Sequence, residues 1–391
     1  YREVEDPSIF FTLKARSNHN KIEKDDEFLV WTTTPWCIPG NLAIAIGNNI
    51  KYSRVLLNKK HYWIATERLE ELKEHDFEIV DETIGTELVG GEYIPAYDEF
   101  EKEYINGAFR IIHSDDTNTE SGSGLVSQAP AYGESDFYAL KNGGIDVIVD
   151  PVTLSGKFDA TIKGLENKFV KDADTKIMEQ LDERNLLFSR TTETHSYPFC
   201  WRTGEPLIYK AIPTWFVNVE KIRERMVELN NSTHWVPGFI GEKRFSNWLA
   251  NARDWAISRN RYWGSCIPVW INIDDPEDLL CLGSIEELER LSGENITDLH
   301  KHFLDDVELK IDGKTYKRTP EVLDCWFESG SMPYGQQHYP FENKDIFMKG
   351  FPADFIAEGL DQTRGWFYTL TVLSVALFDS VAFKNCITTG M

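Results

Sequence analysis

The feature that most constrains the fold is a strand–helix–strand pattern near the end of the chain. FPADFIAEG at residues 351–359 is typical of a buried strand, DQTRGWFYTLTVLSVAL at 361–377 of a buried helix, and FKNCITTGM at 383–391 of a second buried strand. Strands joined through a helix lie parallel in one sheet, and parallel sheets are buried on both faces. The pattern therefore predicts an open α/β sheet.

The sequence predicts two units separated by a proline-containing connector. The length of 391 residues is enough for two or more domains. Residues 1–190 read as mixed strand and helix, and residues 191–245 as a connector whose prolines interrupt regular structure. Residues 246–391 form a second unit, with an amphipathic helix at 242–255 leading into it. An acidic insertion with one short helix is expected at about 271–318.

Three consecutive threonines end the predicted strand EFLVWTTTPW before Pro35. Strand alternation places Thr32 and Thr34 on one face and Thr33 on the other. Three hydroxyls at a strand end could bind a ribose or an ester. The alternative is the ordinary preference of threonine for strands.

Two predicted helices carry acidic residues near their starts. In GSGLVSQAPAYGESDF, Asp136 lies nine positions after Ser127, where a carboxylate could bind an ammonium group or could only stabilise the helix N-terminus. In DADTKIMEQLDERN, Asp172 or Asp174 is expected to cap the helix.

Polar residues follow the strand of the α/β sheet. In an open parallel sheet, ligands bind at the carboxyl ends of the strands. The residues there are Glu358, Gly359, Asp361 and Gln362, which could equally form a loop or a helix cap. Two tryptophans, Trp326 and Trp366, could wall an apolar pocket or belong to the core.

Taken alone, the net charge of −23 argues against a nucleic-acid-binding protein, because phosphate contacts need Lys and Arg. Residues 243–261 are a local exception, since five basic residues and one acid alternate there with tryptophans. Such a stripe could hold a backbone and stack bases, or could be core aromatics under a solvated face. The six cysteines form no CxxC pair, so we expect no zinc tetrad or disulfide framework.

The motifs resemble the isoleucyl-tRNA synthetase family over essentially the whole chain. WTTTPWCIPGN and GSGLVSQAPAYGESDF are similar to two segments of the family's editing insertion. RDWAISRNRYWGSCIPVW, LDCWFESGSMPYGQQHYPFEN and AEGLDQTRGWFYTL resemble the motifs that follow it. The HYPFEN segment is similar to the eukaryotic cytosolic type, though some bacterial enzymes share it.

The resemblance implies a fold and two sites. It implies a mixed α/β, β-barrel-like editing domain at 1–190, joined to the second half of a Rossmann-type nucleotide fold at 246–391. In the family, the editing site holds the terminal adenosine of tRNA and the misattached amino acid. The matching residues here are Thr32, Thr33, Thr34, Trp36, Asn41, Ser127 and Asp136. For the isoleucyl-adenylate site they are Glu358, Gly359, Asp361, Gln362, Trp326 and Trp366.

The chain departs from the family pattern at four points. The family's editing histidine is Ser127 here, and the threonine after WTTTPW is Cys37. Neither HxGH nor KMSKS, the two ATP-binding signatures, occurs. These departures leave three hypotheses: an esterase for mischarged tRNA, a ligase joining isoleucine to tRNA, or a binding module without catalysis. The missing signatures argue against ligase activity for this chain, though not for the full-length protein that carries them.

The resemblance also implies ligands and a setting. The full-length protein would use isoleucine tRNA, isoleucine and ATP with Mg²⁺, and valine would be the misattached amino acid. No cofactor or metal is evident for the editing reaction, which would rest on positioning substrate and water. We expect no membrane association, a monomer and a cytoplasmic location.

Overall fold

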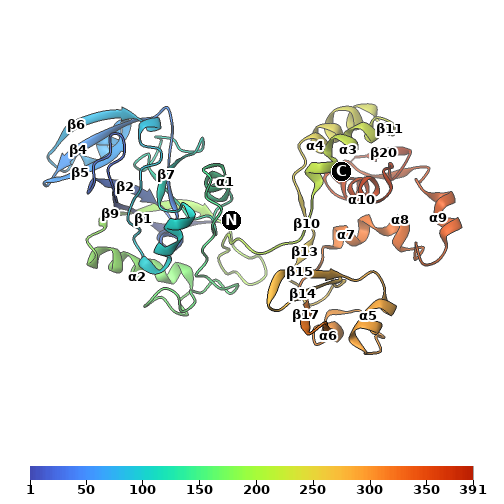
Figure 1. Cartoon of the computed structure of the whole chain (residues 1–391). Coiled ribbons are helices and arrows are strands. Elements are labelled where there is room, and N and C mark those ends of the chain that lie inside the picture. Colours follow the sequence, from blue (N-terminus) through green and yellow to red (C-terminus); the bar gives the residue numbers. More distant parts are fainter. Residues whose placement is uncertain (391) are drawn as a thin grey trace. The chain divides into compact units, whose positions relative to one another are not determined.

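The computed structural model describes residues 1–390 of the chain. Contacts divide it into unit 1, Tyr1–Ile212, and unit 2, Pro213–Met391 (Figure 1). The segment predicted as a connector at 191–245 is divided between them, because its first residues continue a strand of unit 1 and its last ones form helices and a strand of unit 2.

Unit 1 is built on a curled sheet in the order β6-β4-β5-β2-β8-β3-β7, with β1 pairing β2 and β9 (Figure 1). The strands are β1 Arg2–Lys14, β2 Glu27–Thr32, β3 Ala43–Ile46, β4 Lys51–Leu57, β5 Lys60–Ala65, β6 Phe77–Ile84, β7 Arg110–His113, β8 Val126–Gln128 and β9 Leu187–Tyr197. Along β2, Phe28 and Val30 pack into the main core while Leu29 packs into a second cluster, as strand alternation requires. Both faces of the sheet are therefore covered.

Helices complete unit 1. The two α-helices are α1 Glu134–Asn142 and α2 Val170–Glu183, and the 3-10 helices are η1 Pro35–Gly40, η2 Thr66–Leu72, η3 Gly85–Glu87 and η4 Asp98–Asn106. Helix α2 packs against η1 and β9. Its buried side chains Val170, Ala173, Ile177 and Leu181 recur at helical spacing. This packing brings α2 against the turn that follows the threonines.

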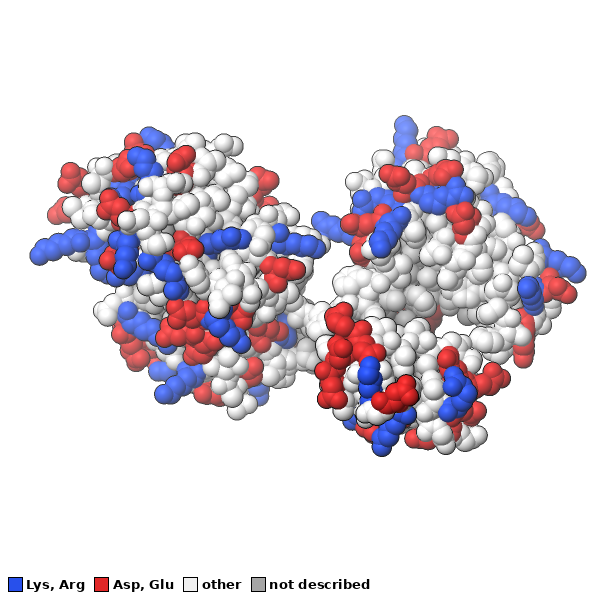
Figure 2. All heavy atoms as spheres, viewed as in Figure 1, with Lys and Arg blue, Asp and Glu red and all other residues white. Residues whose placement is uncertain are grey.

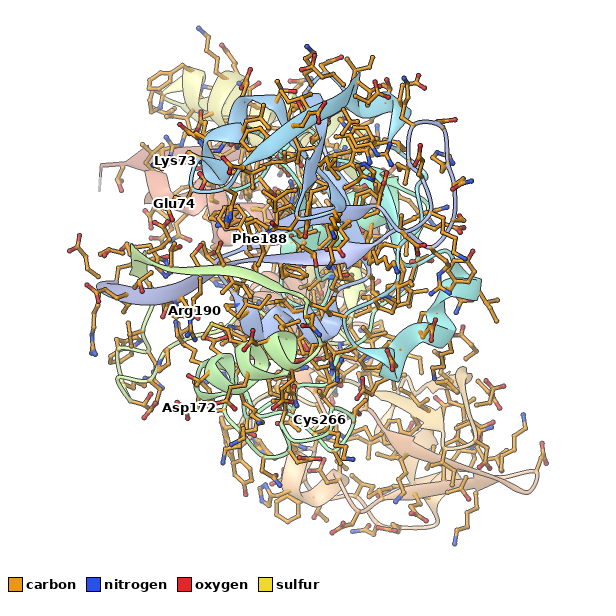
Figure 3. The ribbon with its side chains drawn as sticks, turned by 90° about the vertical axis from the view of Figure 1, so that its left-hand side faces the viewer. Lys73, Glu74, Asp172, Phe188, Arg190 and Cys266 are labelled. Carbon is orange, nitrogen blue, oxygen red and sulfur yellow. The ribbon has the colours of Figure 1, made fainter. Side chains whose placement is uncertain are left out.

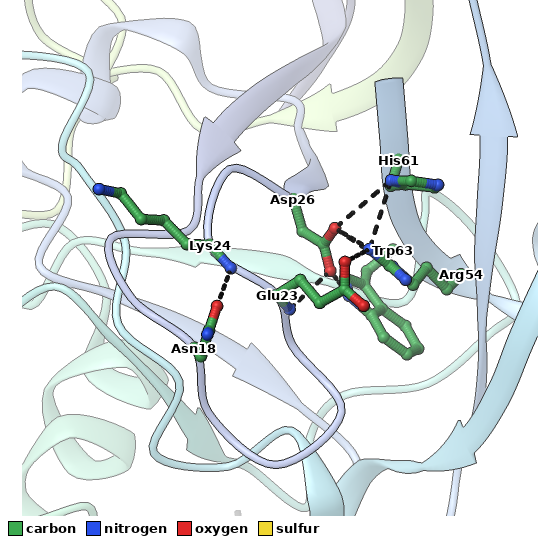
Figure 4. A network of polar contacts seen from close by, with 7 residues as sticks. All are labelled: Asn18, Glu23, Lys24, Asp26, Arg54, His61 and Trp63. Carbon is green, nitrogen blue, oxygen red and sulfur yellow. Dashed lines mark hydrogen bonds and ion pairs between the residues drawn. The ribbon is translucent and has the colours of Figure 1, made fainter. Parts of the chain in front are cut away.

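A buried ion pair ties β4 to the loop before β2 (Figure 4). Asp26 is 2% exposed and accepts hydrogen bonds from Arg54 Nη2 at 2.7 Å, Trp63 Nε1 at 3.0 Å and the backbone N–H of Glu23 at 3.0 Å. Buried charges persist when they are paired and hydrogen-bonded, which is the situation here. The network fixes where β2 begins.

Unit 2 contains a parallel sheet in the order β11-β20-β19. Its strands are β11 His234–Val236, β19 Ile356–Gly359 and β20 Asn385–Thr389. The helices and turns around it are η5 Val219–Ile222, α3 Arg223–Asn230, the π-helix η6 Ile240–Phe245, α4 Ser246–Ala250, η7 Leu360–Arg364 and α10 Trp366–Phe378. The predicted parallel strand–helix–strand unit is confirmed. The prediction that β19 is buried is wrong, because Ala357 and Glu358 on this edge strand are exposed.

The predicted acidic insertion forms a small subdomain with its own core. An antiparallel sheet in the order β15-β14-β17-β16 consists of β14 Val269–Asn272, β15 Asp275–Cys281, β16 Glu308–Ile311 and β17 Lys314–Arg318. Leu288 and Leu304 pack on Trp270 in this core. Two helices are present, α5 Ile285–Ser292 and α6 Lys301–Leu304, where the sequence analysis expected one.

The remaining elements of unit 2 connect these two parts. They are β10 Phe216–Val217, β12 Trp255–Ala256, β13 Ser258–Arg259, β18 Val322–Leu323, α7 Cys325–Gly330, α8 Met332–Gly335 and α9 Lys344–Gly350. The amphipathic helix predicted for 242–255 ends at Ala250, and the residues beyond it pair as the short strands β12 and β13.

Candidate functional site

The threonines form a turn rather than a longer strand. Strand β2 ends at Thr32, because the backbone N–H of Thr34 turns back to donate to Thr32 Oγ1 at 3.0 Å, and η1 starts at Pro35. The prediction that Thr32 and Thr34 share a strand face is therefore wrong. All three side chains are half-buried. Among residues 1–390, no hydrogen bond engages the hydroxyl of Thr33 or Thr34, so both are available to a ligand.

Strand β8 brings Ser127 to the same end of the sheet. β2 and β8 pair in parallel at Trp31 and Val126, so Thr32 and Ser127 follow the paired residues. Asn41, at the end of η1, donates from Nδ2 to Ser127 Oγ at 2.9 Å. The amide of Asn41 is fixed in turn by the hydroxyl of Tyr93, which donates to its Oδ1 at 2.6 Å. Thus Asn41 and Ser127 are in direct contact.

Asp136 lies in the first turn of α1, but it does not cap this helix. The N-cap residue is Gly133, and no side chain accepts a hydrogen bond there. Instead, Asp136 Oδ2 accepts the backbone N–H of Ala129 at 2.8 Å, while Oδ1 has only a long contact of 3.4 Å with the Ser135 hydroxyl. Burial raises the pKa of the Asp136 carboxyl, and its hydrogen bonds only partly offset this. One oxygen thus holds the loop after Ser127, and the other can accept a donor from a ligand.

A buried carboxylate close to these residues, that of Asp174, is not among the predicted site residues. The prediction that Asp172 or Asp174 caps α2 is wrong, because the N-cap is Phe169 and no side chain caps the helix. Asp174 is 6% exposed and accepts the backbone N–H of Trp36 at 2.8 Å. Its place on the apolar stripe of α2, four residues after Val170, is the signal that could have revealed it.

Cys37 lies near both carboxylates. Burial raises the pKa of its thiol well above the ordinary value, and the negative charges of Asp136 and then Asp174 raise it further. The thiol is therefore neutral and is no candidate nucleophile. Trp36, beside it, contacts Tyr132 edge-on with ring centroids 4.8 Å apart. The threonine turn and the loop that follows β8 thus meet through this aromatic pair.

The second predicted group lies in unit 2, at the carboxyl end of β19. Glu358 pairs with Thr388, and Gly359 pairs with Thr389 in the parallel register. A Cβ on Gly359 would come within 2.5 Å of Asp361 Oδ1, so a side chain here would displace the carboxylate of Asp361 from its present position. Glu358 and Asp361 are both exposed.

Gln362 links this strand end to the helix that follows. Its Oε1 accepts the backbone N–H of Trp366 at 2.8 Å, and its Nε2 donates to Asp361 Oδ2 at 3.0 Å. Trp366 donates from Nε1 to the carbonyl of Ser329 at 3.0 Å and lines a cavity of about 310 Å³. Trp326 is 41% exposed and faces the backbone of Gly365, next to Trp366. The structure therefore brings both tryptophans and Gln362 together.

The basic stripe at 243–261 divides into core and surface. Trp248 and Trp255 pack against the core of unit 2, whereas Trp263 is exposed and stacks on His300 at 4.1 Å. Arg259 pairs with the buried Asp324. Acidic and basic side chains are intermixed over the visible face of both units (Figure 2).

Residues 1–390 contain neither a metal-binding cluster nor a membrane-spanning helix. In the described part of the chain, no three His, Cys, Asp or Glu side chains come together in a way that could hold a metal ion. No helix among residues 1–390 has both the length and the apolar character needed to cross a membrane.

Comparison with solved structures returns editing domains of leucyl-tRNA synthetases at low similarity. The cytosolic enzyme of P. falciparum gives a TM-score of 0.36 at 9% identity, covering 48% of this chain and 99% of that domain. The domain of P. knowlesi gives 0.38 at 10% identity, with 47% and 95% covered.

Comparison with curated proteins returns isoleucine–tRNA ligases. That of Protochlamydia amoebophila is 50% identical over 395 residues, and those of Chlamydia pneumoniae and Treponema denticola are 46% identical over 395 and 424 residues. Each match covers 100% of this chain, which spans only 37–38% of the relatives' length. The family model described as "tRNA synthetases class I (I, L, M and V)" matches residues 17–391. The chain belongs to this family of class I tRNA synthetases.

Proposed function

We propose that unit 1 hydrolyses valine from mischarged isoleucine tRNA, and that unit 2 supplies part of the site at which the whole protein activates isoleucine with ATP and Mg²⁺. The observation that carries the first part is the contact between Asn41 and Ser127 beside the threonine turn. It brings residues far apart in the sequence to one strand end, with Asp136 anchored to the adjoining loop. The proposed setting is a monomer in the cytoplasm.

The need for such a reaction follows from a limit on binding. A pocket that fits isoleucine cannot strongly exclude valine, which is smaller by one methylene group. Isoleucyl-tRNA synthetases are the standard example of this limit, with discrimination of about two orders of magnitude. A second site that accepts valine and excludes isoleucine restores fidelity by hydrolysing the ester.

The geometry of unit 1 supports hydrolysis by an oriented water molecule. Oδ1 of Asp136 would accept the ammonium group of the valyl ester, while Oδ2 keeps its bond to Ala129. The hydroxyls of Thr33 and Thr34 would contact the ribose and the ester. Water attacks the carbonyl carbon, the C–O bond to the ribose breaks, and the ribose oxygen takes a proton. Hydroxyl and amide dipoles stabilise the developing oxyanion, and positioning supplies the rest of the rate.

The geometry of unit 2 supports amino acid binding in the whole protein. Trp366 lines the cavity of about 310 Å³, and Trp326 lies against Gly365, the residue before Trp366, so the two rings could supply apolar walls for the amino acid. Glu358 and Asp361 present exposed carboxylates at the strand end, where they could receive an amino group or ribose hydroxyls. Gln362 is held by its bond to the N–H of Trp366.

Deacylation of valyl-tRNA by the 391-residue chain tests the main proposal. We expect first-order release of valine above the spontaneous rate, and much slower release of isoleucine from correctly charged isoleucine tRNA. The double variant Thr33→Ala with Thr34→Ala should lose most of the activity and keep its melting temperature. Release of valine no faster than in buffer would contradict the proposal. Retained binding of tRNA in that case would favour a binding module without catalysis.

A further inference from the structure

Asp174 is a carboxylate in a place where the helix pattern calls for an apolar side chain. It lies on the buried face of α2, next to Ala173 and one turn from Val170 and Ile177. A buried carboxylate costs free energy unless hydrogen bonds satisfy it. Asp172, two residues earlier, is exposed and points away from the sheet (Figure 3). The two acids of this helix therefore have different surroundings.

The hydrogen bond of Asp174 reaches the start of η1, 138 residues away in the sequence. Pro35 has no N–H, and the side chain of Thr34 does not cap this helix. The N–H of Trp36 is thus the first donor of η1, and Asp174 accepts it at 2.8 Å. A carboxylate on α2 performs the role that a local N-cap residue would normally perform.

Fixing Trp36 also fixes its neighbours. The threonine turn ends one residue before Pro35, and the backbone N–H of Cys37 donates to the carbonyl of Thr34 at 3.0 Å. The ring of Trp36 packs on Tyr132, which lies in the loop between Ser127 and α1. Asp174 is therefore linked to both halves of the proposed editing site, although no contact places it on the threonine hydroxyls.

We propose that Asp174 is a positioning residue of the editing site, which holds the threonine turn in place through the N–H of Trp36. The inference rests on the proposed function of unit 1 and adds to it a dependence on the protonation of this one carboxyl. When Asp174 is ionised, the bond to Trp36 is charge-assisted and holds the turn firmly. When Asp174 is protonated, the bond is a weaker neutral one.

The groups that surround Asp174 come from four elements. Lys171 and Asp172 lie on α2, Asp6 on β1, Cys37 on η1 and Tyr197 on β9. The pKa of Asp174 is raised to about 7 by the sum of these surroundings. Burial is the largest cause and the charges of Asp6 and Asp172 add to it, whereas the N–H of Trp36 and the charge of Lys171 oppose it. Lys171 is shared, because it also pairs with Asp6, which accepts a hydrogen bond from His195 at 2.9 Å. The protonation state of Asp174 therefore changes near neutral pH.

The pH dependence of deacylation in matched variants tests this role. The wild-type chain should deacylate valyl-tRNA faster as the pH rises through about 7. Asp174→Asn keeps an oxygen acceptor for Trp36 but has no charge, so it should lose this step and be about tenfold slower at pH 8.5, the difference between a charged and a neutral hydrogen bond. At pH 5.5 the two chains should differ less than threefold. Asp174→Ala should be slower than Asp174→Asn at every pH. Asp172→Asn should keep the wild-type rate at pH 8.5 and the step itself, with the midpoint moved toward lower pH because a charge that raises the pKa of Asp174 is removed.

An NMR measurement on the same chains separates failure of this inference from failure of the proposed function. The backbone amide signal of Trp36 should shift with a midpoint near pH 7 in the wild type and should not titrate in Asp174→Asn. A wild type that deacylates valyl-tRNA while Asp174→Asn shows an unchanged pH profile would overturn the positioning role. An amide of Trp36 that ignores both pH and the substitution would also overturn it. A wild type without deacylation, but with the titrating amide, would overturn only the proposed function.

Discussion

Replacing Asp136 separates a role in substrate binding from a role in stability. Asp136→Asn keeps an oxygen that can accept the N–H of Ala129, which the wild-type carboxylate accepts at 2.8 Å. It removes the charge that would bind the ammonium group of the substrate. A charge-assisted hydrogen bond contributes about 1.5–3 kcal/mol, so kcat/KM for valyl-tRNA should fall roughly tenfold to 150-fold. Asp136→Ala also releases Ala129 and should cost more.

The same substitution has a defined effect on stability. Burial raises the pKa of Asp136 above its ordinary value of 3.8. A carboxyl whose pKa is higher in the folded chain stabilises the fold most below its unfolded pKa, and this contribution is lost as the pH rises through the folded pKa. At pH 7.5 the charge is therefore unfavourable to folding, and Asp136→Asn should leave the melting temperature unchanged or raise it.

Deacylation kinetics and thermal melts on one preparation decide whether Asp136 binds substrate or only stabilises the helix. Asp146→Asn, which changes an exposed carboxylate just after α1, is the control and should alter neither quantity much. If Asp136 only stabilises the start of α1, Asp136→Asn will lower the melting temperature and leave the rate per folded molecule within threefold of the wild type. That result would refute the binding role.

Changes at three further positions test other parts of the structure. Ser127→Ala removes one acceptor of the Asn41 amide and should slow deacylation tenfold or less, as a neutral hydrogen bond predicts, whereas Ser127→His should speed deacylation up. Kinetics from pH 5.5 to 8.5 would check both, and a loss beyond a hundredfold in Ser127→Ala would contradict them. Trp366→Ala in the whole protein should raise the KM for isoleucine by removing an apolar wall, at roughly 25 cal/mol per Å² buried, and an unchanged KM would mean that Trp366 is only core. Arg54→Ala leaves Asp26 buried without its cation and should lower the free energy of unfolding, measured in urea, by about 3–5 kcal/mol. A loss under about 1 kcal/mol is typical of an exposed ion pair and would contradict this prediction.

The sequence predicted the local elements of both units better than their burial. The parallel pairing of β19 with β20 follows from the helix between them, and the register at Glu358 and Thr388 confirms it. The same apolar pattern led to the expectation of a buried strand, but β19 is an edge strand and its Ala357 is exposed. The residue pattern indicates which side chains of a strand could be buried. Whether they are buried depends on the elements that pack against the strand in the fold.

For the candidate site, too, the residues could be predicted from the sequence but their contacts could not. Ser127 and Asn41 were identified by resemblance, but their contact required the pairing of β8 with β3 and β2. The partner of Asp174 could not be predicted, because the N–H of Trp36 lies 138 residues away and helical periodicity contains no information on such a contact. The turn at Thr34 was missed because a threonine side chain can bond its own backbone neighbours as readily as it can extend a strand.

The direction of a carboxyl's pKa separates acids that stabilise this fold from acids that serve the site. A hydrogen bond from Lys314 is the largest influence on Asp278 and lowers its pKa, so ionised Asp278 is favoured by folding and its contribution is lost as the pH falls. Asp136 and Asp174 have the opposite sign, because burial raises the pKa of both. At neutral pH each would stabilise the chain more if it were uncharged. One of these acids holds a backbone N–H of the loop after β8 and the other holds the first N–H of η1. The stability of the fold does not explain them, and their positions fit the proposed editing site.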